Sequence, residues 1–167
     1  MILYPDFYCK DVTKITPEFL KENEIKGIIL DIDNTLIDID RKMLEGAVKW
    51  HEEVVNSGVK SIILSNTNKI DKVEMVAKAL NVEYINFAKK PAKGGFVKAK
   101  KKLELDEKNI AVIGDQIFTD VVGAKRCNMF AILVEPVDKR DFWYTKWKRP
   151  LESIIIKKYL ENERKAK

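Results

Sequence analysis

Acidic side chains crowd behind a short apolar run near the start of the chain. In the stretch GIILDIDNTLIDID, residues 27–40, the apolar run is followed by Asp31, Asp33, Asn34, Asp38 and Asp40. Carboxylates a few ångströms apart repel one another, and they stay ionised together only where a cation lies among them. Mg²⁺ is a hard dication that prefers such oxygen ligands. The stretch therefore predicts one part of a metal site.

Polar side chains also follow three other apolar runs of the sequence. These side chains belong to Ser65 and Asn66 after VKSIIL, Lys89 and Lys90 after VEYINF, and Asp115 and Asp120 after IAVIG. In a parallel α/β sheet, functional groups gather at the carboxyl ends of the strands, near the point where strand order reverses. We therefore expect these groups to converge with Asp31 and Asp33.

The combined set of groups fits phosphoryl transfer. Ser65 and Asn66 can bind phosphoryl oxygens, and Lys90 can supply a fixed positive charge beside Asp31. Asp31 is the expected nucleophile, which would form an aspartyl-phosphate. Asp33 is the expected acid that protonates the leaving oxygen and the base that then activates water.

Competing motifs are missing from the sequence. An EF-hand loop starting at Asp31 would need Gly and Glu where Leu36 and Lys42 stand. The chain has no GxxxxGK[ST], no GxGxxG and no GxSxG. Two cysteines and one histidine exclude a zinc site of four Cys or His ligands.

The apolar runs indicate the elements that must position these groups. They are continuously apolar rather than alternating, as expected of parallel strands buried on both faces, and they cover residues 27–32, 59–65, 82–87, 110–114 and 130–134. Helical patterns lie between and after them, over residues 44–55, 70–80, 96–103, 119–128 and 151–163. This alternation predicts an α/β sheet with right-handed crossovers.

The length and composition suit one globular domain. The chain has 167 residues, of which 46% are hydrophobic and 34% charged, and its net charge of +5 favours anionic partners. We expect a single domain over residues 1–167, in which residues 1–26 form an N-terminal extension that packs on the core. Thr16 and Pro17 begin a helix in this extension. No secretion signal and no run of about 18 apolar residues is evident, so we expect a cytoplasmic protein.

Four motifs together resemble the haloacid dehalogenase (HAD) superfamily of phosphatases. The family pattern hhhhDxDxT matches IILDIDNTL, the strand ending in Ser or Thr matches IILSN, the Lys that is often followed by Pro matches Lys90-Pro91, and GDxxxxD matches GDQIFTD. Lys89 is a competitor for the lysine position, although Pro91 favours Lys90. The likeness extends over nearly the whole chain to the small YqeG-type branch, which is related to the mitochondrial phosphatidylglycerophosphatases.

The resemblance implies roles for individual residues. Asp31 is similar to the nucleophile and Asp33 to the acid/base, whereas Ser65 and Lys90 are similar to the phosphate-binding pair. The implied Mg²⁺ ligands are Asp31, the backbone carbonyl of Asp33, and Asp115, with Asp120 in support. The resemblance implies a three-layer α/β/α, Rossmann-like fold with a parallel five-stranded sheet in the order 5-4-1-2-3. The branch implies hydrolysis of phosphatidylglycerophosphate to phosphatidylglycerol.

The short spacing between motifs predicts a capless enzyme with an open site. An open site suits a bulky substrate, such as a lipid head group or a protein side chain. Two alternatives are a phosphatase of a soluble phosphate ester or phosphoprotein, and a signalling domain that accepts a phosphoryl group without hydrolysing it. Such a signalling domain has no second carboxylate two residues after its phosphate-accepting Asp, so Asp33 distinguishes the two alternatives. The oligomeric state stays open.

The stretch 138–150 interleaves aromatic and basic residues. Its aromatic members are Phe142, Trp143, Tyr144 and Trp147. They can anchor the last helix, contact anionic lipid or stack on nucleic acid bases. We expect no nucleic acid partner, and we expect contact with an anionic membrane to be peripheral, at the inner membrane face. Arg149 can also reach a substrate phosphate.

Overall fold

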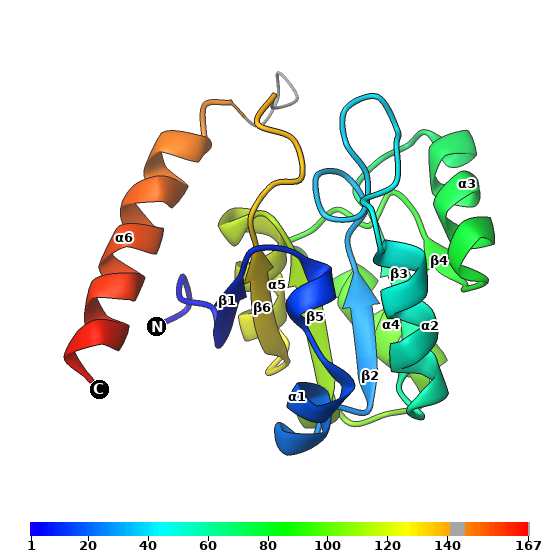
Figure 1. Ribbon diagram of the computed structural model, residues 1–167, viewed down its shortest axis with the longest axis horizontal. Helices are drawn as coiled ribbons and strands as arrows, with labels where there is room; N and C mark the ends of the chain where they lie inside the picture. Colours follow the sequence, from blue (N-terminus) through cyan, green and yellow to red (C-terminus); the bar gives the residue numbers. More distant parts are fainter. Residues whose placement is uncertain (141–145, 167) are drawn as a thin grey trace.

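The computed structural model describes residues 1–140 and 146–166, and in them a parallel six-stranded sheet lies between two layers of helices (Figure 1). The strands are β1 (Phe7–Cys9), β2 (Gly27–Leu30), β3 (Lys60–Leu64), β4 (Tyr84–Ile85), β5 (Ile110–Gly114) and β6 (Phe130–Val134). They are ordered β1-β6-β5-β2-β3-β4 and every pairing is parallel. The order reverses between β2 and β5, so the site is expected where these two strands end.

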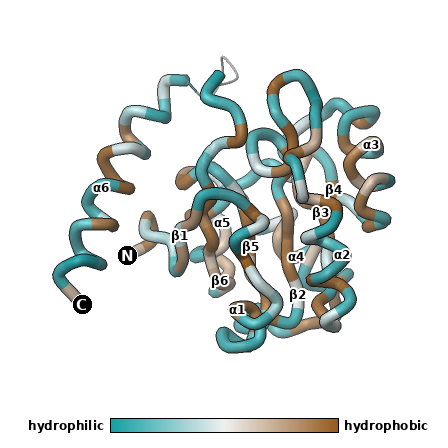
Figure 2. The backbone as a smooth tube through the Cα atoms, viewed as in Figure 1, coloured by the Kyte–Doolittle hydropathy of each residue, from teal (hydrophilic) through white to brown (hydrophobic). Residues whose placement is uncertain are grey.

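Each central strand is buried on both of its faces. In β2, Ile28 and Leu30 pack into one hydrophobic cluster while Ile29 packs into the other. Figure 2 shows the tube of β2 largely in brown, the colour of hydrophobic residues. Burial on both faces explains why the strands appear in the sequence as continuous apolar runs.

The helices divide between the two faces. The first hydrophobic cluster includes side chains of η1 (Val12–Lys14), α1 (Pro17–Glu22), α2 (Ala47–Asn56) and α3 (Ile70–Leu80). The second cluster includes side chains of α4 (Lys93–Leu103), η3 (Ile117–Val121), α5 (Val122–Arg126) and α6 (Arg149–Lys165). A short helix, η2 (Glu107–Asn109), precedes β5. The three-layer α/β/α prediction is therefore confirmed.

The N-terminal segment corrects the predicted strand number. The five predicted strands have the predicted order, but β1 adds a sixth strand beside β6, with Phe7 opposite Ile132. A three-residue strand is too short for its periodicity to be visible in the sequence. The predicted start of α1 is confirmed, because Thr16 Oγ1 accepts a hydrogen bond of 3.1 Å from the N–H of Phe19.

Three other predicted elements differ in length or type. The strand predicted at 82–87 is limited to Tyr84–Ile85, and Phe87 lies beyond it with a φ of 49°. The helix predicted at 119–128 is instead a π-helical turn, η3, followed directly by the short helix α5. The helix predicted at 151–163 extends over Arg149–Lys165.

The β2–α2 connection contains no inserted domain. It consists of a loop in which Ile37 bridges to Asp33 and to Met43 before α2 begins. Within the described residues, no helix combines the length and the low polarity that a membrane crossing requires. Phe142, Trp143 and Tyr144 lie outside the described residues.

Candidate active site

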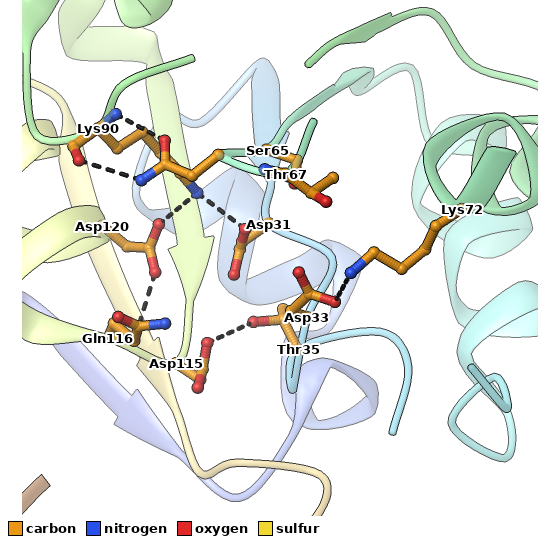
Figure 3. A network of polar contacts seen from close by, with 11 residues as sticks. Asp31, Asp33, Thr35, Ser65, Thr67, Lys72, Lys90, Asp115, Gln116 and Asp120 are labelled. Carbon is orange, nitrogen blue, oxygen red and sulfur yellow. Dashed lines mark hydrogen bonds and ion pairs between the residues drawn. The ribbon is translucent and has the colours of Figure 1, made fainter. Parts of the chain in front are cut away.

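Lys90 joins two buried carboxylates at the carboxyl end of the sheet. Its Nζ lies 2.8 Å from Asp31 Oδ1 and 2.7 Å from Asp120 Oδ1 (Figure 3). Asp31 directly follows β2, Lys90 follows β4 and Asp120 lies in η3, so the topology brings together residues that are far apart in the sequence. Burial by itself would lower the pKa of Lys90, but attraction to Asp120 and Asp31 outweighs burial and raises the pKa. Lys90 is therefore a permanent positive charge in the site.

Asp115 completes a group of three buried carboxylates. One oxygen each of Asp31, Asp115 and Asp120 lies within 4.8 Å of the others. The pKa of Asp120 is raised to about 6, because burial, together with the charge of Asp31, outweighs the opposing effect of Lys90. The pKa of Asp115 is raised well above its ordinary value by burial; Arg149 opposes this rise, whereas Asp31 and Asp120 add to it. The site thus holds negative charge that its surroundings destabilise.

Arg149, at the start of α6, binds Asp115. Its guanidinium lies 2.5 Å from Asp115 Oδ2 and also donates to the backbone carbonyl of Asp115 at 2.9 Å. In this structure Arg149 pairs with Asp115, and the expectation that it can also reach a substrate phosphate stays a prediction. Glu152 accepts hydrogen bonds from the N–H groups of Ile117 and Phe118, at 2.8 and 3.3 Å, and so attaches α6 to the start of η3.

Asp33 has a separate partner that the motifs do not contain. Lys72 Nζ lies 2.6 Å from Asp33 Oδ1, and Lys72 is only 4% exposed. Burial raises the pKa of Asp33; the hydrogen bond from Lys72 lowers it and the charge of Asp31 raises it again. Lys72 lies in the first turn of α3, where a positive charge is unfavourable because it opposes the helix dipole. This unfavourable position is the feature of the sequence that could have indicated an acidic partner for Lys72.

Ser65 and Asn66 lie where β3 ends. Ser65 lines the cavity over Asp31 and accepts a hydrogen bond of 3.2 Å from the N–H of Thr67. The Asn66 side chain accepts from the Lys90 N–H at 2.6 Å and donates to the Lys90 carbonyl at 3.1 Å. Asn66 thus holds the Lys90 backbone in this structure, and its predicted contact with phosphate stays a prediction.

Three other charged residues, Lys89, Asp38 and Asp40, lie away from the group of three buried carboxylates. Lys89 is exposed and lies over the ring of Phe87, so the structure brings Lys90 and not Lys89 to Asp31. Asp38 accepts hydrogen bonds from the backbone N–H groups of Asp40 and Lys42. The crowding of acidic residues in the sequence therefore has two causes, a site and a structured loop.

The donor set fits a divalent cation. Five carboxylates lie in this part of the described structure, from Asp31, Asp33, Asp115, Asp120 and Glu152, and the three cations that bind them are Lys72, Lys90 and Arg149. If all are ionised, two negative charges are uncompensated by these partners. Asp31, Asp115 and Asp120 could hold a hard dication through oxygen atoms, and Mg²⁺ favours such ligands.

A cavity of about 380 Å³ opens above these residues. Its lining includes Asp31, Asp33, Ser65, Lys72 and Lys90. Ligand cavities in proteins commonly measure about 300–1,000 Å³, so this one suits a small head group.

Gly114 lets Asp120 reach the other carboxylates. A Cβ atom at position 114 would lie 2.3 Å from the Asp120 carboxyl group. This contact explains the glycine in GDQIFTD, because any side chain there would displace Asp120.

We expect Gly114→Ala to weaken binding of a divalent cation by about tenfold or more, as loss of supporting contacts around metal ligands does. Isothermal titration with Mg²⁺ and with Mn²⁺ measures the effect. Gly94→Ala is the control, because a Cβ atom there meets nothing within 4 Å. Equal affinities in the two variants would contradict the role given to Gly114.

The comparisons with known proteins relate the chain to phosphatases. The family described as "Mitochondrial PGP phosphatase" matches residues 1–138. The chain is 39% identical over 153 residues to "Probable phosphatase YqeG" of Bacillus subtilis, covering 91% of the chain and 88% of that relative. It is 27% identical to "Phosphatidylglycerophosphate phosphatase 1, chloroplastic/mitochondrial" of Arabidopsis thaliana, covering 93% of the chain but only 48% of the plant protein.

A crystal structure of an uncharacterised protein from Listeria monocytogenes shares the fold. Its TM-score is 0.56 at 19% identity, covering 71% of the chain and 86% of that protein. The family match and the bacterial relative each span most of the chain. The chain therefore belongs to the PGP phosphatase family, in the YqeG-type branch of the HAD phosphatases.

Proposed function

We propose that the protein is a Mg²⁺-dependent phosphomonoesterase that removes the phosphate from phosphatidylglycerophosphate through an aspartyl-phosphate. The observation that carries this proposal is the pairing of Lys90 with Asp31 inside a cavity that Asp33 also lines. The family description and the name of the plant relative support the lipid substrate.

Asp31 is the proposed nucleophile. A carboxylate oxygen of Asp31 would bond to phosphorus while the bond from phosphorus to the alcohol oxygen breaks. Lys90 would compensate negative charge on the transferring group, and the Ser65 hydroxyl would donate to a phosphoryl oxygen. When bound, the divalent cation would supply electrostatic stabilisation of the phosphoryl oxygens.

Asp33 is the proposed acid and base. It would give its proton to the departing alcohol, and burial favours the protonated form that this step needs. In the second step it would accept a proton from the water that hydrolyses the phosphoaspartate. Its presence favours a hydrolase over a domain that stores the phosphoryl group.

The size of the cavity favours entry of the head group alone. About 380 Å³ leaves no room for two acyl chains beside a glycerophosphate, so the chains of a lipid substrate would remain outside. The β2–α2 loop contributes no inserted domain that would cover them.

The substrate is tested with purified protein on a panel of phosphate esters. The panel contains phosphatidylglycerophosphate in mixed vesicles, glycerol phosphate, sugar phosphates, nucleotides and a phosphopeptide. We expect kcat/KM to be highest for the lipid, by about tenfold or more, which corresponds to about 1.4 kcal/mol. A preference for a soluble ester or the peptide would overturn the lipid assignment but leave the phosphatase intact. One phosphate transferred per protein, without release, would indicate the signalling domain.

Asp31→Asn is expected to lower turnover of p-nitrophenyl phosphate by about 10³-fold or more, because the nucleophile is lost. Asp40→Asn is the control, since Asp40 belongs to the same acidic stretch but is exposed and pairs with Arg140. Circular dichroism checks that both variants fold. Activity of Asp31→Asn near that of the control would disprove the nucleophile assignment.

Lys72→Met is expected to lower kcat by about 10–100-fold with little change in KM, because Asp33 loses the partner that orients its carboxylate. Lys72→Arg should recover part of the loss. Lys78→Met, on the exposed side of the same helix, should behave as the wild type. A rise in KM alone would show that Lys72 binds substrate instead of positioning Asp33.

A further inference from the structure

Two exposed aromatic side chains lie beside the cavity. Phe87 is 58% exposed and lines the cavity together with Lys148, and Trp147, the neighbour of Lys148, is 68% exposed. Phe87 comes from the segment after β4, whereas Trp147 comes from the turn before α6. The apolar surface at the cavity is thus supplied from two separate parts of the chain, and the proposed chemistry leaves it unexplained.

Each aromatic ring has a lysine next to it. Lys89 Nζ lies 5.4 Å from the centre of the Phe87 ring, and Lys148 Nζ lies 5.3 Å from the centre of the Trp147 ring. A cation at this distance is attracted to the face of the ring. We call Phe87, Lys89, Trp147 and Lys148 the lysine–aromatic rim. It combines apolar surface with positive charge at the entrance of the site.

The backbone holds Phe87 in its exposed position. Its φ of 49° is uncommon for a bulky residue, and the neighbouring chain fixes it through two hydrogen bonds. The Phe87 N–H donates to the Thr67 carbonyl at 3.0 Å, and the Ala88 N–H donates to the Ser65 carbonyl at 2.9 Å. The segment after β3, which carries Ser65, thus holds the backbone at Phe87 in place through these two hydrogen bonds.

Helix α6 continues the apolar surface away from the cavity. Trp147, Leu151 and Ile154 recur at the spacing of one helix face, and Leu151 and Ile154 are both exposed. Lys157 and Lys158 follow them and are exposed as well. The opposite side of the helix faces the protein, because Glu152 and Tyr159 are buried. Figure 1 shows α6 along one edge of the molecule, so this outer face is accessible.

We propose that the lysine–aromatic rim, continued by Leu151 and Ile154, docks on an anionic phospholipid bilayer with the cavity facing the lipid head groups. Tryptophan is enriched at the boundary between lipid and water, and lysines near it are attracted to anionic lipid. The inference rests on the proposed function only for the identity of the substrate lipid, because the docking surface is inferred from the exposure of its apolar side chains and the charge of its lysines.

Charge and area argue against a second copy of the chain on this surface. A two-fold interface would bring the positively charged rim of one copy against the same positively charged rim of the other, and the two would repel. The few exposed apolar side chains also fall short of the roughly 800 Å² per partner that a stable protein interface buries. A bilayer satisfies both the positive charge and the shallow apolar surface.

The test is flotation of the full chain with vesicles of phosphatidylcholine alone and of phosphatidylcholine mixed with phosphatidylglycerol. We expect binding only to the mixed vesicles, with binding that falls as salt rises. The affinity of the double variant Trp147→Ser, Leu151→Ser for the mixed vesicles should be lower by about tenfold or more. Phe87→Asn should also bind the mixed vesicles more weakly, because it removes the ring. Asparagine is chosen because it tolerates the positive φ, so the backbone there can stay as it is. The control is Val97→Ser, which removes an exposed apolar side chain from α4.

The outcomes separate the docking surface from the proposed activity. Equal vesicle binding by the wild type and the double variant would overturn docking, even if phosphatidylglycerophosphate in detergent is hydrolysed. Vesicle binding that depends on the rim supports docking, even if another phosphate ester proves to be the substrate. A single-stranded oligonucleotide that binds through the rim more tightly than the vesicles do would overturn docking in favour of nucleic acid. Circular dichroism establishes that each variant is folded.

Discussion

Repulsion among buried carboxylates is the constraint on which the rest of the structure depends. Asp31, Asp115 and Asp120 bring oxygen atoms within 4.8 Å of one another in a buried site. Burial disfavours the charged form of a carboxylate, and close negative neighbours disfavour it further. The raised pKa values of Asp115 and Asp120 express this cost. The fold must therefore deliver positive charge to the end of the sheet.

The positive charges come from three separate parts of the scaffold. Lys90 follows β4, Lys72 belongs to α3 and Arg149 begins α6, and each binds a different carboxylate or pair of carboxylates. These ion pairs also have a structural role. Arg149 binds Asp115, and Glu152 binds the backbone at the start of η3. Helix α6 therefore supports the site although it lies at the edge of the molecule (Figure 1). A change in α6 can thus reach the chemistry.

The size of the cavity and the surface at its entrance bear on which substrates can reach these charged residues. The volume of the cavity suits a small head group, while Phe87 and Trp147 place apolar surface around and beside its entrance. An enzyme that admits only the head group needs another means of holding a large substrate, and a surface beside the entrance can provide it. The proposed docking of the rim and the proposed lipid substrate are consistent in this respect, although each can fail without the other.

Much of the fold and most of the site residues could be predicted from local sequence patterns. Continuous apolar runs predicted five of the six strands that the structure describes, and polar residues at their ends predicted which groups meet at the end of the sheet. These features depend on neighbours in the chain, so they are visible without the structure. The three-residue strand β1 could not be predicted, because its stability comes from pairing with β6, which lies more than 120 residues away.

By itself, the sequence determined that Asp31, Asp33, Ser65, Lys90, Asp115 and Asp120 would gather at the carboxyl end of a parallel sheet. Only the tertiary structure decided how they are partnered: Lys72 on Asp33, Arg149 on Asp115, and the Asn66 side chain on the backbone of Lys90. The physical reason is that ion pairing and burial depend on distances between segments, which periodicity along the chain does not encode.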